Sequence, residues 1–201
     1  MKKQFVTITM VMAMILFVPT SCAGGNKKND NNADLEFARM SEEVPEETMQ
    51  LYNNLMDSFT DDWEDVEPAP DAYPEYYGGV FISNDGKLVV MMTEVNDENR
   101  ADVVARVKSE DFETELCEYS YREMMETMNR IDQFLSDPKV SGSHPVILNF
   151  GGSIADILEN RVVVHLMDAS PDVLAAFVRD VSDSDCIMFS EGAMFEEPSG
   201  N

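Results

Sequence analysis

Tyr76–Glu94 reads YYGGVFISNDGKLVVMMTE, and this stretch decides the fold. Two apolar runs flank the turn formers Asn84–Gly86, and this arrangement predicts a β-hairpin. The residues that follow suit a helix over Asn96–Lys108, with Asn96 as its cap. Polar and apolar side chains then alternate over Phe112–Tyr119, as they do in a half-buried strand. The stretch and its continuation therefore predict a β-β-α-β unit.

The same pattern returns 74 positions further along, which indicates an internal repeat without a gap. Gly86 falls on Asn160, and asparagine is the residue after glycine that best tolerates a positive φ. In the second unit we expect strands near Ile147–Ala155 and Arg161–Met167, and a helix over 170–181. The predicted correspondences are Gly78 with Gly152, Val80 with Ile154, Lys87 with Arg161, Leu88–Val90 with Val162–Val164, Val103 with Phe177, Val107 with Val181, and Phe112 with Cys186.

A strong amphipathic helix is predicted between the two units. Ser120 and Glu123 have the spacing of a capping box, and the helix ends at Asp137-Pro138. Its apolar stripe is rich in methionine, which at helical spacing usually fills a core. The stripe residues are Met124, Met128, Ile131 and Leu135.

Residues 34–75 precede the first unit and have two parts. The apolar spacing predicts a helix over about Pro45–Ser58, and 34–40 has a weaker helical pattern. Residues 61–75 are acidic and contain three prolines, so they read as a solvated linker with Trp63 and Tyr73 held against the body. The carboxylates there lack the glycine and glutamate spacing of a calcium-binding loop.

The predicted fold class is therefore α+β. Two β-β-α-β repeats, at about 78–119 and 146–190, are joined by the long amphipathic helix and preceded by an N-terminal helix. We expect the repeats to form an α+β domain over 76–192, followed by a tail at 193–201.

The first 21 residues read as a signal peptide. Lys2 and Lys3 precede an apolar run at Phe5–Val18, which falls short of the roughly 20 residues that span a bilayer. Small residues before Cys22 resemble a bacterial lipoprotein signal, in which Cys22 would be acylated and become the mature N-terminus. Pro19 departs from that pattern, because a leucine is common there. An ordinary secretory signal with an incidental cysteine is the alternative.

Residues 22–33 are small and polar, as in a flexible tether between a membrane and a folded body. The expected location is the cell envelope, lipid-anchored through Cys22, in the outer membrane if the cell has two membranes. The formal net charge of −25 repels nucleic acid and anionic headgroups. We interpret this charge as one that keeps the protein soluble and holds it away from a negatively charged membrane. Binding to a partner with a basic face is the more specific alternative.

The histidines, serines and cysteines form no catalytic or metal-binding pattern. His144 lies in a predicted loop beside Ser143, and His165 takes the place of Met91 in the second repeat, as a packing position would. Ser143 and Ser153 lack a nucleophile elbow. The histidines and cysteines are too scattered for a zinc site. No enzyme and no cofactor is expected.

Cys117 and Cys186 raise the question of a disulfide, since an exported protein sits where disulfides persist. The two are not equivalent in the repeat, and Cys186 aligns with a phenylalanine. Packing as a small hydrophobe is therefore preferred for Cys186, with the disulfide left to geometry.

Two stretches resemble the pro-regions of secreted bacterial trypsin-like serine proteases, including the alpha-lytic protease group. Those pro-regions often read GG, strand, turn, strand, V-T early, and N-R-V-V-V-x-L, helix, I-x-F-x-x-G late. Here the early pattern is Tyr76–Glu94, and the late one is Asn160–Leu166 (NRVVVHL) with Ile187–Gly192 (IMFSEG). The resemblance covers about 76–192.

A pro-region of that family folds its protease and then inhibits it. This sequence ends at Asn201 with no catalytic domain, so the resemblance implies a stand-alone, membrane-tethered relative that binds a protease supplied in trans. If the docking mode carries over, the closing strand is the contact, by strand addition at a sheet edge. An envelope lipoprotein with a structural or generic binding role is the alternative, and an uncharacterised hydrolase the third reading. The expected contact residues are Cys186, Ile187, Met188, Phe189 and Ser190.

Overall fold

The structure is a computed structural model that describes residues 44–60 and 68–192. Several predictions fall on other residues. The signal peptide, Cys22, the tether at 22–33, the helical pattern at 34–40, Trp63 and the tail at 193–201 all lie outside the described residues.

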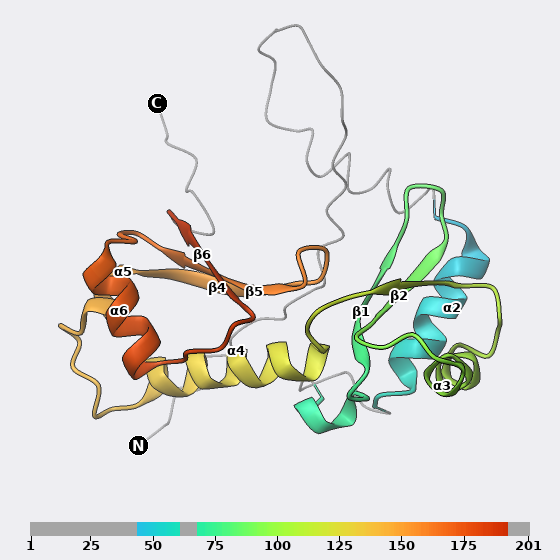
Figure 1. The fold of residues 1–201 in the computed structure, drawn as a ribbon, viewed down its shortest axis with the longest axis horizontal. Helices are drawn as coiled ribbons and strands as arrows, with labels where there is room; N and C mark the ends of the chain where they lie inside the picture. Colours follow the sequence, from blue (N-terminus) through green and yellow to red (C-terminus); the bar gives the residue numbers. More distant parts are fainter. Residues whose placement is uncertain (1–43, 61–67, 193–201) are drawn as a thin grey trace, which may run out of the picture.

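The first domain contains a three-stranded sheet covered by two helices (Figure 1). Its strand order is β1-β2-β3, with β1 antiparallel and β3 parallel to the central β2. The parallel pair is connected through α3, as a parallel connection requires. Its elements are α2 (Glu46–Asp57), the short 3-10 helix η1 (Pro70–Ala72), β1 (Tyr77–Ile82), β2 (Leu88–Met92), α3 (Asp97–Val107) and β3 (Glu113–Leu116).

The second domain repeats this arrangement with a second three-stranded sheet, in the order β4-β5-β6. In Figure 1, α4 lies along one face of that sheet and leads from the first domain into the second. The predicted α+β class is confirmed, and the two repeats form two separate sheets. The elements are α4 (Tyr121–Ser136), α5 (Pro145–Asn149), β4 (Phe150–Asp156), β5 (Arg161–Leu166), α6 (Pro171–Asp180) and β6 (Ile187–Glu191).

The helix caps predicted at Asn96 and Ser120 form, whereas the side chain of Ser170 makes no capping hydrogen bond. The side chain of Asn96 accepts a hydrogen bond from the amide of Asn99, and that of Ser120 accepts one from Glu123. Pro171 occupies the first turn of α6, where its missing N–H costs nothing. The helix expected over 45–58 is α2.

One expected strand start is wrong. Residues 145–149 form the short helix α5, and β4 begins only at Phe150. The cause is local: Pro145 presets a helical φ in the first turn, and the ring of His144 caps the helix by accepting from the amide of Val146.

Each domain has its own hydrophobic core. Leu55 of α2 and Val103 of α3 are fully buried against the first sheet. Met124 and Ile131 of α4 and Phe177 of α6 are fully buried against the second. Met124 and Met128 of α4 are therefore core residues, as predicted. The corresponding helix residues Val103 and Phe177 both point inward, also as predicted.

The repeat is real, but it is not free of gaps. Gly79 pairs with Met91 where Gly152 pairs with His165, so the first strands are related by a shift of 73. Gly86 and Asn160 both have positive φ, at 79° and 50°, and keep the shift of 74. In the closing strands, Val89 pairs with Glu113 where Val163 pairs with Met188, a shift of 75.

The expected pairs Gly78 with Gly152, Val80 with Ile154, and Phe112 with Cys186 are therefore wrong by one position. The β4–β5 turn holds one residue more than the β1–β2 turn, and the connection into β6 one more than that into β3. Turns accept such insertions because they lie at the surface, whereas the strands and helices they join keep their packing.

Among the residues that the structure describes, no helix has both the length and the apolar character needed to cross a bilayer.

Candidate functional site

The candidate partner-binding strand lies at an edge of the second sheet. β6 pairs with β5 and with no other strand of the described chain. Cys186 lies just before β6, which extends one residue beyond Ser190 to Glu191. The expected contact strand is therefore an edge strand, displaced by one residue from its expected limits.

Two hydrogen bonds fix which backbone groups of β6 face β5. The carbonyl of Cys186 accepts from the amide of Val162 at 2.9 Å, and the amide of Gly192 donates to the carbonyl of Leu166 at 2.8 Å. Backbone groups alternate in direction along a strand, so Met188 and Ser190 also face β5. The amide and carbonyl groups of Phe189 and Glu191 consequently point away from the sheet.

Ile187 is the first residue of β6 whose backbone groups point away from β5, and its amide already has a partner. The amide of Ile187 donates to the carbonyl of Ser184 at 3.2 Å. The backbone groups of Phe189 and Glu191 have no hydrogen-bond partner among the described residues. These two positions form the open edge of β6 and could pair with an incoming strand.

The side chains of β6 hold the strand in place. Phe189 packs edge-to-face on Phe177, with ring centroids 5.1 Å apart, and Ile187 also packs on the second core. Met188 is on the other face of the sheet, in line with Val163 and Ile154 of the neighbouring strands. Figure 1 shows α4 under one face of this sheet, while Met188 remains 38% exposed.

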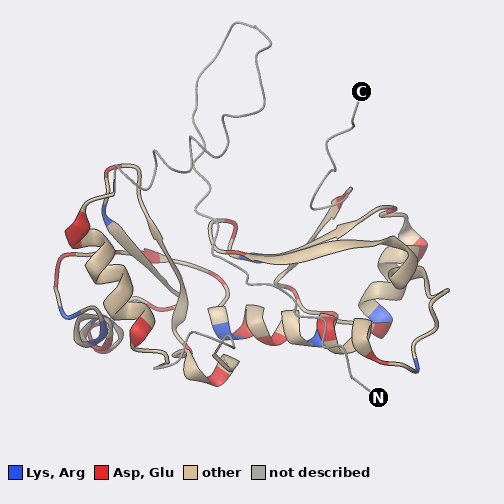
Figure 2. Ribbon diagram, turned by 180° about the vertical axis from the view of Figure 1, so that it is seen from behind, with Lys and Arg blue, Asp and Glu red and all other residues tan. Residues whose placement is uncertain are grey.

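The equivalent edge strand of the first domain is protected by charge. β3 carries Glu113 and Glu115, and Glu113 pairs with Lys87 at 2.7 Å. In β6 the only acidic residue is Glu191, at its end. Charged side chains on an edge discourage pairing with another chain, so of these two equivalent edges β6 is the less protected one. Figure 2 shows that acidic positions are otherwise spread over helices and loops of both domains.

His144 has both ring nitrogens engaged. Nδ1 accepts from the amide of Val146 at 3.2 Å, and Nε2 lies 3.1 Å from a carboxylate oxygen of Asp180. The ring also packs edge-to-face on Phe134. The Oγ of Ser143 lies 2.8 Å from that of Ser141. His144 therefore joins α4, α5 and α6, and its ring nitrogens serve structural contacts rather than Ser143.

His165 is a half-buried strand residue of β5, as predicted, and it lies opposite Gly152. Cys117 and Cys186 are both free thiols. Cys186 is fully buried, which agrees with packing as a small hydrophobe. Burial, with the nearby charge of Glu115, raises the pKa of Cys117 to about 11, so this thiol stays protonated at neutral pH. Over the described residues, no three metal-ligating side chains come together.

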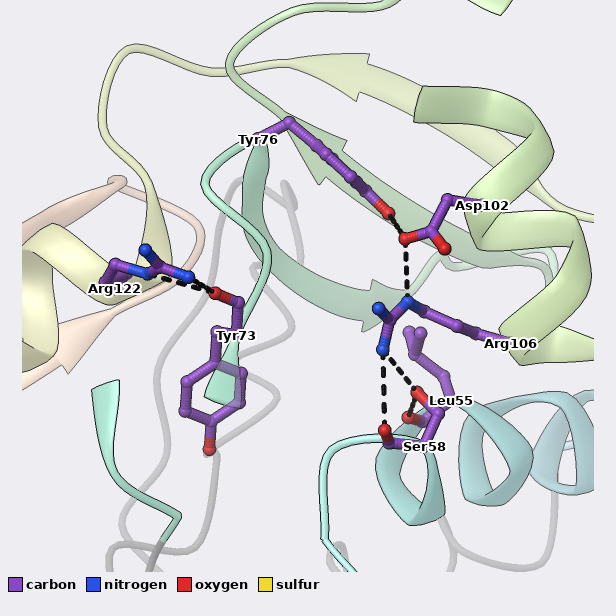
Figure 3. Close-up of polar contacts among 7 residues, drawn as sticks. All are labelled: Leu55, Ser58, Tyr73, Tyr76, Asp102, Arg106 and Arg122. Carbon is purple, nitrogen blue, oxygen red and sulfur yellow. Dashed lines mark hydrogen bonds and ion pairs between the residues drawn. The ribbon is translucent and has the colours of Figure 1, made fainter. Parts of the chain in front are cut away.

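A polar network at the start of β1 was not visible in the sequence (Figure 3). The hydroxyl of Tyr76 donates to Asp102 at 2.5 Å, and Nε of Arg106 donates to the same carboxylate oxygen at 2.8 Å. Arg106 also donates from Nη1 to the carbonyl and hydroxyl of Ser58. Burial and the bond to Asp102 raise the pKa of Tyr76, so Tyr76 acts as a neutral donor. The network joins β1, α3 and the end of α2.

An open pocket of about 350 Å³ lies beside this network. Its lining mixes Asp57 and Asp102 with Arg106 and Lys108. Arg106 already has protein partners on Nε and Nη1, so the pocket offers no concentrated charge of either sign. We assign the network a structural role.

Two family models match this chain. A model described as the Pro-like N-terminal domain matches residues 38–117, and one described as the Pro-like C-terminal domain matches residues 122–192. The boundary between the matches coincides with the passage from β3 into α4. No curated protein matches the chain. The two domains of the fold thus correspond to a pair of Pro-like domains, which fits a pro-region-like module and agrees with a non-catalytic role.

Proposed function

We propose that this protein is an exported lipoprotein, anchored in the cell envelope through acylated Cys22, that works by binding another protein. It performs no catalysis itself. Its pro-region-like module acts on an exported serine protease supplied in trans, as an inhibitor or as a folding partner.

The observation that carries this proposal is the open edge of β6. It lies in the second Pro-like domain, it carries one acidic residue, at its end, where β3 carries two, and it presents the backbone groups of Phe189 and Glu191. An added strand could bond to these groups without any change in the rest of the sheet.

The choice of partner rests on two further observations. The pair of Pro-like domains suggests a protein partner such as a protease. The formal net charge of −25 favours a partner whose docking face is basic, because complementary charge speeds encounter and disfavours wrong partners.

Refolding and inhibition of a purified protease test this proposal. A secreted trypsin-like serine protease from the same cell, produced without its own pro-region, is denatured and refolded with and without the full chain in detergent micelles. We expect a higher yield of folded protease with the chain present, or inhibition of protease that is already folded. Neither effect on any such protease, together with peptide hydrolysis by the chain that is lost in His144→Ala, would contradict the proposal.

A further inference from the structure

The side chain of Asn160 holds the segment that connects the two domains. Its Oδ1 accepts from the amides of Glu118 and Tyr119, at 2.9 and 2.7 Å, and its Nδ2 donates to the carbonyl of Tyr119 at 2.8 Å. The residue is only 5% exposed. Three hydrogen bonds to one buried side-chain amide are a strong local restraint, since losing them would leave the amides of residues 118 and 119 without these partners.

The same β4–β5 turn also contacts the first domain directly. A Cβ placed on Gly79 of β1 would lie 2.7 Å from Cγ2 of Ile157, so Ile157 occupies the space that the glycine leaves. The φ of Gly79 is 132°, in a region that side-chain-bearing residues rarely adopt. Gly79 thus permits a close approach between β1 and a turn of the second domain.

Charged and aromatic groups reinforce this contact. Arg161, the residue after Asn160, donates to Glu118 at 2.7 Å and stacks over the ring of Tyr119, 4.5 Å from its centroid. On the other side of the connection, Arg122 donates from Nε to the carbonyl of Tyr73 at 3.0 Å (Figure 3). The ring of Tyr121 packs edge-to-face on that of Tyr73, with centroids 4.7 Å apart.

The backbone alone does not require an asparagine at this position. Gly86 occupies the equivalent place in the β1–β2 turn and also has a positive φ. A glycine at 160 would satisfy the same backbone conformation, but it could not bind residues 118 and 119. The side-chain amide of Asn160 therefore forms hydrogen bonds that the glycine in the turn of the first repeat cannot form.

We propose that Asn160 and the β4–β5 turn lock the two Pro-like domains in one orientation, so that they meet a partner as a single rigid body. Asn160 is a positioning residue: it acts on the partner through the connection at 118–119. The effect on the partner rests on the proposed function, whereas the lock itself does not.

Residue-resolved hydrogen exchange of the full chain in detergent micelles tests the lock without any partner. In Asn160→Gly, the amides of Glu118 and Tyr119 should exchange about tenfold faster or more, because both lose their acceptor. Amides within β5 and β2 should keep their protection, since the cores are untouched. Lys108→Gly is the matched control, because Lys108 also has a positive φ, of 62°, and lies at the end of α3.

Domain orientation is measured separately, by the distance between genetically encoded spin labels at the exposed positions Glu98 and Asp172. The unaltered chain and Lys108→Gly should give one narrow distance distribution, and Asn160→Gly a broader one. Asn160→Asp, which keeps an acceptor for the two amides but loses the donor to Tyr119, should lie between them and serves if the glycine variant does not fold. Unchanged exchange at 118 and 119, or an equally narrow distribution in Asn160→Gly, would overturn the lock. A broadened distribution with unaltered partner binding would leave the lock standing and overturn its effect on the partner.

Discussion

The carbonyl of Cys186 accepts a hydrogen bond from the amide of Val162, and this contact sets the direction of every backbone group in β6. Because directions alternate along a strand, Met188 and Ser190 face β5, and Phe189 and Glu191 face away from it. The open edge of β6 thus has two usable positions, and substitutions can address the inner and outer groups of the strand separately.

Met188→Pro should destabilise the second domain. It removes an amide that faces β5, so a buried carbonyl of β5 loses its donor, at a cost of about 1–3 kcal/mol. Urea unfolding of the full chain measures the loss. Met188→Ala, which keeps the amide, is the control; equal stability of the proline and alanine variants would show that the direction assigned to Met188 is wrong.

Phe177→Ala should cost about 3–5 kcal/mol of unfolding free energy, because a fully buried ring that packs on Phe189 is replaced by a cavity. Val178 is the neighbouring residue and is 47% exposed, so Val178→Ala should change stability by only about 0.5 kcal/mol or less. Chemical denaturation compares the two variants. Similar losses in both would contradict the assigned inward face of α6.

Asp102→Asn should reduce the stability that the protein loses in acid, compared with the unaltered chain. Burial opposes ionisation of Asp102, but hydrogen bonds from Tyr76 and Arg106 outweigh it and lower the pKa below its ordinary value of 3.8. A carboxylate with a lowered pKa stabilises the fold above its unfolded-state pKa, and this contribution is lost as the pH falls through the folded-state value. The unaltered chain should therefore lose stability below about pH 4, and the variant should lose less.

Unfolding midpoints between pH 6 and about pH 3 measure this difference. Because Asp102 is partly exposed, the effect is small, and the exposed Asp183→Asn serves as the control. Identical pH profiles for Asp102→Asn and the unaltered chain would contradict the assigned role of the network.

Cys22→Ser should release the protein from the membrane fraction, since a serine cannot be acylated through sulfur and residues 22–33 then lead to no anchor. Fractionation of cells that express the variant measures the change, and Cys117→Ser is the matched control. Membrane association that persists in Cys22→Ser would remove the lipid anchor from the proposal.

The sequence predicts the elements of this fold well, because their signals are local. The caps at Asn96 and Ser120, the inward positions Val103 and Phe177, and the positive φ shared by Gly86 and Asn160 each depend on neighbouring residues. The single-residue shifts between the two repeats cannot be found by aligning their sequences. An insertion in a turn leaves the apolar pattern on both sides almost unchanged.

The contact strand itself is expected from the sequence, but two features that decide how it and the domains would act are not visible there. A residue's amide can face inward or outward in a strand of the same composition, so the roles of Met188 and Glu191 depend on how β6 pairs. The contact of Asn160 with residues 118 and 119 joins segments more than 40 positions apart, and no local pattern encodes it.

The most direct test of the central claim is protease binding by two matched proline variants of the full chain. Glu191→Pro removes an outward amide from β6. Leu116→Pro removes the equivalent outward amide from β3, because the amide of Cys117 donates to Met92 of β2 and backbone directions alternate; the side chain of Leu116 is 68% exposed. Glu191→Gln controls for the lost charge. We expect Glu191→Pro to weaken binding of the protease by about tenfold or more, while Leu116→Pro and Glu191→Gln bind as the unaltered chain does. Equal binding by Glu191→Pro and the unaltered chain, or a loss confined to Leu116→Pro, would contradict docking at the edge of β6.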